Sequence, residues 1–242
     1  FFFTQKPAYA ILSGLVGSEM CIRDRNIGIK FGGNTIPLVP SAVIFDLGVG
    51  SSKVRPSFQE GYAAAKEAKK EFLTGKVGVG TGCTVGKLLG KDFSMEGGLG
   101  FSSHTFSDGT IVSALVAVNA LGSIVNPENG QLIAGPKRDG KIFDSLDLLV
   151  NGKPQKRGFQ NTTIGTIMTN AKISKVDCKR LAVAANDGLA MSVRPSHTSN
   201  DGDLFFAFSN SQIDTKLTID QLFGASIKTT YQAINNAIIE SN

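Results

Sequence analysis

The sequence predicts a compact α+β domain that combines helices with tightly layered sheets. Hydrophobic residues make up 41% of its 242 residues and the mean hydropathy is +0.04, as in an ordinary globular core. Glycines lie inside apolar stretches between residues 78 and 100, where glycine usually marks a bulge or a close approach of backbones. Strand-like apolar runs also alternate with segments of helical spacing. We therefore expect one domain.

Charge and cysteine usage disfavour several classes of protein. Lys and Arg exceed Asp and Glu by five (25 − 20), and the excess is spread along the chain, which argues against dedicated nucleic-acid binding. No segment approaches the roughly 18 apolar residues of a membrane span. Cys21, Cys83 and Cys178 lie far apart, so neither a zinc site nor a disulfide framework is indicated. These features favour a cytoplasmic protein with no nucleic-acid or membrane partner.

The first 25 residues resemble translated sequencing-adapter sequence, on the run SGLVGSEMCIRDR at residues 13–25. They do not fit a signal peptide, because the only early cation, Lys6, follows the aromatic residues and no mature start follows the small residues. We therefore assign residues 1–25 as non-native and residues 26–242 as the single domain.

A strand and a surface helix are the first elements expected in that domain. The apolar run of residues 36–47, with two prolines at its start, predicts a strand in its second half. Pro56 opens a helix in which apolar residues recur from Phe58 to Phe72, and Gly75 ends it. Lysines on its other face are typical of a surface helix.

The glycine-rich stretch of residues 77–87 does not match a nucleotide-binding loop. In the phosphate-loop pattern the first glycine would fall on Thr81, and Lys87 is not followed by Ser or Thr. The dinucleotide pattern also fails, since Val85 stands where glycine is needed. We expect a strand and turn that present Thr84 and Lys87.

Two strands joined by a turn at Asp108-Gly109 are expected at residues 97–103 and 110–120. The second strand ends in Asn119, a polar amide that either caps the strand or serves a function. Residues 126–157 are rich in turn residues, as a long processable linker would be.

The last third of the chain predicts two strands, each followed by a helix. Thr- and Ile-rich residues 161–171 form the first strand, and a helix follows the capping residue Ser174. Residues 204–209 are expected to be a buried strand, and Thr218 caps the last helix.

A hydroxyl residue, Thr162, opens the strand at residues 161–171, directly after Asn161. If its hydroxyl attacked the Asn161 carbonyl, the peptide would rearrange to an ester and water would release a new N-terminus. The α-amino group, with an unperturbed pKa of about 7.7 to 8.0, would then be a general base for its own hydroxyl. The alternatives are an ordinary loop-to-strand junction and a glycosylation acceptor.

Two carboxylates, Asp201 and Asp203, come just before the strand at residues 204–209. In a site without a catalytic histidine, they would hold and polarise the amine and hydroxyl of a nucleophile. The alternative is a hairpin turn, for which Asp-Gly is a favoured pair. His104 and His197 are expected to be ordinary polar loop residues.

Six groups of motifs follow one another along the chain. They are IPLVPSAVIFDL (36–47), GTGCTVGKLL (80–89), GGLGFSS (97–103), ALVAVNA (114–120), NTTIGTIMTNA (161–171) and NDGL with DGD (186–189 and 201–203). Together they resemble the L-aminopeptidase/D-esterase family, β-aminopeptidase-like, self-processing N-terminal-nucleophile hydrolases that include the nylon-oligomer hydrolases. The resemblance covers nearly everything from about residue 26. Members normally have a substantial segment before the first motif, so we expect an N-terminally truncated chain.

The resemblance implies a four-layer αββα sandwich. It also implies a cut between Asn161 and Thr162 that leaves two associated chains, residues 26–161 and 162–242. A homo-oligomer of these cleaved pairs is expected.

The resemblance also assigns roles in the site. Thr162 would be the nucleophile, which Asp201 and Asp203 orient and activate. Asn119 would donate to the oxyanion, and the Lys87 cation would stabilise negative charge. No metal or organic cofactor is implied.

The resulting hypothesis is a self-processing, threonine-type aminopeptidase or amidohydrolase acting on N-terminal aminoacyl peptides or related small amides and esters. One alternative is hydrolysis of linear oligoamides, as in the nylon-hydrolase-like members. Another is an acyl transferase of the ornithine-acetyltransferase type, which the Asp pair and the motif at residues 36–47 disfavour. The last is a non-catalytic binding or structural protein in which the Asn161-Thr162 bond stays intact.

Overall fold

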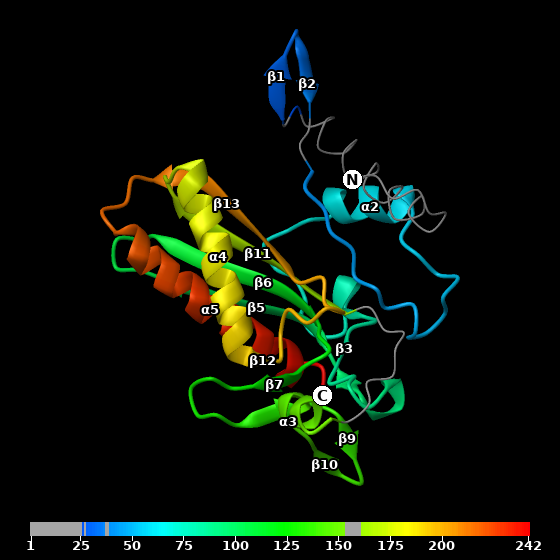
Figure 1. Ribbon diagram of the computed structural model, residues 1–242. Helices are drawn as coiled ribbons and strands as arrows, with labels where there is room; N and C mark the ends of the chain where they lie inside the picture. Colours follow the sequence, from blue (N-terminus) through cyan, green and yellow to red (C-terminus); the bar gives the residue numbers. More distant parts are fainter. Residues whose placement is uncertain (1–25, 27, 37–38, 153–160) are drawn as a thin grey trace. The chain divides into compact units, whose positions relative to one another are not determined.

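A computed structural model describes residues 26, 28–36, 39–152 and 161–242 of the chain (Figure 1). The foreign-looking segment 1–25 lies outside the described residues. Residues 37–38 of the first motif and 153–157 of the expected linker lie outside them as well.

The described residues divide into two compact units. The larger unit consists of Ile44–Val49 and Leu73–Asn242, and the smaller one holds Gly50–Phe72 with the described residues before Ile44. Each unit is described by itself. That residues 26–242 form one domain stays a prediction.

The smaller unit contains a short antiparallel hairpin of β1 (Ile29–Phe31) and β2 (Asn34–Ile36), and the helix α2 (Phe58–Lys66). The helix has a capping box at Ser57, but it ends at Lys66, so the predicted extension to Gly75 is wrong. None of its residues is fully buried, and a short helix that buries little gains too little from packing to extend into a Lys- and Glu-rich sequence.

A four-stranded sheet forms the centre of the larger unit, in the order β13-β11-β6-β5 (Figure 1). The predicted pair of strands with a turn at Asp108-Gly109 is confirmed as antiparallel β5 (Gly98–Thr105) and β6 (Ile111–Asn119). The strand β11 (Thr162–Ala171) runs antiparallel to β6 and parallel to β13 (Leu204–Ile213).

Two long helices cover one face of this sheet (Figure 1). The helix α4 (Lys175–Ser192) connects β11 to β13, and α5 (Ile219–Ile239) packs on α4, β5 and β6. Both begin at the predicted caps, Ser174 and Thr218, whose side chains accept backbone N–H bonds from the first turn. Fully buried side chains of this layer include Val112, Val116, Ile167, Leu181, Leu189 and Ile234.

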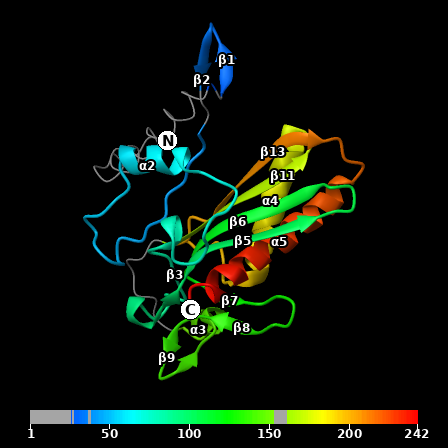
Figure 2. The ribbon, with the colours of Figure 1, turned by 180° about the vertical axis from the view of Figure 1, so that it is seen from behind.

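Figure 2, which shows the molecule from behind, presents the face of the sheet that α4 and α5 do not cover. Side chains alternate along a strand, and Ile167 and Ala171 of β11 point into the helix-covered core. Thr162 and Met168 therefore lie on the opposite face. Leu204 and Phe208 of β13 are exposed there, and of residues 204–209 only Phe205 is buried, so the prediction of a buried strand at residues 204–209 is wrong.

The structure contains α-helices together with strands in antiparallel and parallel pairs, which confirms the α+β class. Within the described ranges, no helix is long and apolar enough to cross a membrane. A second, three-stranded sheet has the order β12-β7-β8, and the larger unit contains further short elements. The remaining elements are η1 (Gly78–Gly80), β3 (Thr84–Val85), η2 (Lys91–Phe93), β4 (Met95–Glu96), β7 (Ser123–Val125), β8 (Leu132–Ala134), β9 (Lys137–Arg138), β10 (Lys141–Ile142), α3 (Ser145–Val150) and β12 (Val193–Arg194).

Candidate active site

Thr162 is the first residue of β11, and its hydroxyl lies against the peptide bond that precedes it. The Oγ1 atom donates a hydrogen bond to the carbonyl oxygen of Asn161 at 2.5 Å. Thr162 is 8% exposed and Asn161 is 1% exposed. The hydroxyl and the carbonyl are thus held together in a mostly buried place.

The loop before β13 holds Asn161 through its backbone. The Asn161 N–H donates to the carbonyl of Asn200 at 3.0 Å, and the Asn161 carbonyl accepts from the Gly202 N–H at 2.8 Å. Asn161 and Asp201 form a parallel β-bridge. A Cβ atom on Gly202 would lie 3.1 Å from Thr162 Oγ1, so the loop approaches the hydroxyl closely.

Asp203 lies beside the residue that follows the candidate nucleophile. Its Oδ1 atom accepts from the Thr163 N–H at 2.7 Å, and its side chain is 1% exposed. Its Oδ2 atom accepts from the His197 N–H at 3.1 Å. The carboxylate therefore fixes the start of β11 from the side of β13.

Asp201 is held by three donors. Its Oδ2 atom accepts from the Thr198 hydroxyl at 2.6 Å and the Thr198 N–H at 3.2 Å, and its Oδ1 atom accepts from the Leu121 N–H at 3.3 Å. Burial raises the pKa of the Asp201 carboxyl, and the nearby Asp203 charge adds to the rise, while the Thr198 hydroxyl opposes it. The hairpin interpretation of Asp201-Gly202 is wrong, because the following strand runs parallel to β11.

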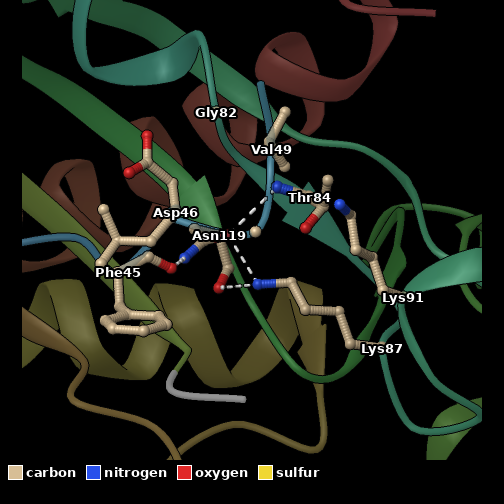
Figure 3. Close-up of a pocket in the computed structure, with 10 residues that line it drawn as sticks. Phe45, Asp46, Val49, Gly82, Thr84, Lys87, Lys91 and Asn119 are labelled. Atoms are coloured by element: carbon tan, nitrogen blue, oxygen red, sulfur yellow. Dashed lines mark hydrogen bonds between the residues drawn. The ribbon is translucent and has the colours of Figure 1, made fainter. Parts of the chain in front are cut away.

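Asn119, the last residue of β6, pairs with Thr162 across the sheet. It is 1% exposed, and its Oδ1 atom accepts from Lys87 Nζ at 2.6 Å and from the Thr84 N–H at 3.1 Å (Figure 3). Its Nδ2 atom donates to the carbonyl of Phe45 at 3.2 Å. The amide is thus fixed in one orientation, with its donor side toward residues 44–49.

Lys87 is a buried cation, 6% exposed, whose ammonium donates to both the backbone and the side-chain oxygen of Asn119. Burial lowers its pKa to about 8, against the attraction of nearby Cys83, Asp201 and Asp46. Its charge therefore changes near neutral pH.

A pocket of about 290 Å³ opens beside Asn119 and Lys87 (Figure 3). Phe45 and Asp46 line one side of it in place of the predicted strand, which is absent from described residues 39–47. The wall contains one carboxylate and two ammonium groups, with apolar surface between them. The lining residues are Phe45, Asp46, Leu47, Gly48, Val49, Gly82, Thr84, Lys87, Lys91 and Asn119.

All the side chains that the sequence selects come together at one end of the main sheet. Asn119 and Thr162 are paired there, Lys87 bonds to Asn119, and the two aspartates approach from the loop before β13. Within the described part of the chain, no three His, Cys, Asp or Glu side chains cluster as metal ligands.

Sequence reasoning missed several groups that shape the site. Thr198 could have been noticed, because a Thr three residues before Asp201 is a common loop-capping pattern. The backbone N–H of Gly202 has no sequence signal. The expectation of a loop residue is wrong for His104, which lies in β5. His197 does lie in a loop, where its N–H bonds to Asp203.

Two solved structures share this fold. The PH0078 protein from Pyrococcus horikoshii OT3 superposes with a TM-score of 0.62 at 21% identity, over 96% of this chain and 63% of that one. A β-aminopeptidase from Burkholderia sp. superposes with a TM-score of 0.59 at 20% identity, over 97% and 65%. At these identities the likeness concerns the fold, which confirms the α+β architecture expected from the resemblance.

The chain belongs to Peptidase family S58, whose sequence model matches residues 10–242. An uncharacterized aminopeptidase of Mycobacterium leprae, ML1167, is 36% identical over 222 residues, which are 86% of this chain and 59% of the relative. A 6-aminohexanoate-oligomer endohydrolase of Paenarthrobacter ureafaciens is 31% identical over 190 residues, 76% of this chain and 53% of the relative. The resemblance predicted from the motifs is confirmed, and the chain spans less than two thirds of these relatives.

Proposed function

We propose that this protein is a self-processing amide hydrolase that cuts itself between Asn161 and Thr162 and then uses Thr162 as its nucleophile. The observation that carries the proposal is the 2.5 Å contact between Thr162 Oγ1 and the Asn161 carbonyl oxygen at the start of a strand. Membership of a peptidase family supports the same chemistry.

Self-cleavage begins with attack of the Thr162 hydroxyl on the Asn161 carbonyl carbon. A C–O bond forms, and the carbonyl π electrons move to the oxygen. The C–N bond then breaks, and the hydroxyl proton ends on the departing nitrogen, which becomes the α-amine of Thr162. Water hydrolyses the ester, leaving a carboxylate on Asn161 and a free hydroxyl on Thr162.

In the cut enzyme, the α-amine of Thr162 takes the proton from the neighbouring hydroxyl as it attacks a substrate. Asn119 is the proposed donor to the substrate oxyanion. Lys87 and Thr84 occupy its Oδ1 atom, so its Nδ2 atom is the group free to exchange the Phe45 carbonyl for a substrate oxygen.

The proposed substrates are peptides with a free N-terminal residue, on the basis of the relatives named as aminopeptidases. Linear oligoamides are the second candidate, because the endohydrolase relatives at 31% identity are named for 6-aminohexanoate oligomers. Matched amides with free and blocked amino ends separate the two, since an aminopeptidase requires the free end.

The mass of the denatured protein tests self-cleavage. We expect two fragments from the wild-type chain, the smaller one beginning at Thr162, and a single uncut chain from Thr162→Ala. Thr163→Val is the matched control: Thr163 is fully buried, and its Oγ1 has no hydrogen-bond partner among the described residues. A folded wild-type chain that stays whole would contradict the proposal.

A further inference from the structure

The scissile carbonyl oxygen accepts hydrogen bonds from two groups of the described residues before any cut is made. One comes from Thr162 Oγ1 at 2.5 Å and the other from the Gly202 N–H at 2.8 Å. When Oγ1 bonds to the carbonyl carbon, it stops being a donor to that oxygen. The Gly202 N–H is then the remaining donor of the two, at the moment when negative charge develops.

In the uncut chain the Asn119 amide group bonds to a different oxygen. Its Nδ2 atom donates to the carbonyl of Phe45, on the pocket side of the site (Figure 3). Its Oδ1 atom, which accepts from Lys87, can only repel an oxyanion. The two reactions of one threonine can therefore use different donors.

The loop that carries Gly202 is fixed on both sides. Asp201 is held by the Thr198 hydroxyl and the Leu121 N–H, and Asp203 is held by the Thr163 N–H. A donor with such support needs little reorganisation when charge develops, which is the condition under which an oxyanion donor contributes most.

We propose that the backbone N–H of Gly202 is the oxyanion donor of the self-cleavage step, and that Asn119 serves the later substrate reaction only. This inference rests on the proposed self-cleavage. It gives the aspartates a second task, which is to hold the glycine between them against the scissile carbonyl. Glycine suits this place because a Cβ atom would lie 3.1 Å from the attacking hydroxyl.

Replacing the peptide nitrogen of Gly202 by oxygen removes the N–H without adding an atom. The full chain is made by joining a recombinant fragment that ends at Asp177 to a synthetic segment that begins at Cys178. Refolding starts the reaction, and intact mass follows it, beside an all-amide chain made in the same way. We expect the ester chain to cut about 10²- to 10³-fold more slowly, the usual loss when one oxyanion donor is removed.

Equal rates in the two refolded chains would overturn the role of Gly202 and leave self-cleavage intact. An all-amide chain that folds and stays whole would overturn self-cleavage, and the inference with it. If the ester chain does not refold, hydrogen exchange of the Gly202 amide in the uncut Thr162→Ala chain decides. Protection supports the inference, and exchange at the rate of an open loop overturns it.

Discussion

Lys87 is a buried cation of the site, and its charge changes near neutral pH. Its ammonium is buried against Asn119, and burial brings its pKa to about 8. A lysine with a lowered pKa loses its charge as the pH rises through that value. The pH dependence of the proposed self-cleavage would therefore report which form of Lys87 the reaction needs.

If the Lys87 cation stabilises negative charge, self-cleavage should slow by about tenfold between pH 7 and pH 9, as the protonated fraction falls. The first-order rate after refolding, measured by intact mass at each pH, checks this. Lys87→Met should cut slowly and lose the pH dependence. A rate that rises over the same range would instead make Lys87 a base.

The space around Gly202 gives a second prediction at this scale. Gly202→Ala should slow self-cleavage, because its Cβ atom would press on Thr162 Oγ1 at 3.1 Å while the N–H donor is kept. The rate of cutting after refolding measures the effect. Gly224→Ala is the matched control, since a Cβ at Gly224 meets nothing within 4 Å. Wild-type rates in both variants would contradict the close approach.

At the scale of elements, α5 lies so close to β5 that the strand has no room for a side chain at Gly100. A Cβ there would lie 1.9 Å from the Ala233 carbonyl oxygen and 2.8 Å from the Ala237 Cβ. We expect Gly100→Ala to lower the free energy of unfolding by about 1–3 kcal/mol or more, as overpacking does. Urea denaturation measures the change.

The exposed helix position Gly224 supplies the opposite case. Gly224→Ala should raise the free energy of unfolding by about 0.5–1 kcal/mol, because alanine loses less backbone entropy in a helix. If Gly100→Ala and Gly224→Ala changed the free energy of unfolding equally, the close packing of α5 on β5 would not explain the effect at Gly100.

The strands and helices of the main layer could be predicted because local signals and packing agree there. The apolar run that ends at Asn119 forms β6, and Ser174 and Thr218 start α4 and α5. The run at residues 43–47 carries a similar strand signal, but a strand forms only where its backbone bonds to a neighbouring strand. The Phe45 carbonyl accepts a hydrogen bond from the Asn119 side chain and not from a neighbouring strand.

The site was predictable in its side chains and not in its backbone groups. A hydroxyl after Asn161 and a pair of aspartates are visible in the sequence. The parallel pairing of β11 and β13, which brings Asp201 beside Asn161, depends on the α4 crossover. A backbone donor such as the Gly202 N–H becomes visible only when two distant segments are placed together.

On the scale of the larger unit, the proposed cut separates segments that are interleaved. Residues before the cut supply β5 and β6, and those after it supply β11, α4, β13 and α5. The strand β11 lies between β6 and β13, and α5 packs on β5 and β6. The core contains side chains from both sides, such as Val116 and Ile234.

We therefore expect the two fragments to stay together after cutting. Gel filtration without denaturant should give one species that contains both fragments, and denaturant should separate them. The reason is that their contact is the hydrophobic core itself. Fragments that elute separately while the protein keeps its circular dichroism spectrum would contradict this.

The interleaved sheet also changes the thermodynamics of the molecule once the bond is broken. The uncut chain folds in a unimolecular reaction, so its melting temperature does not depend on dilution. The cut form must reassemble from two pieces, and its stability then includes a concentration term. The cut form would thus arise from a unimolecular folding reaction, whereas its refolding would require two fragments to meet. Its working lifetime would then depend on how slowly it unfolds.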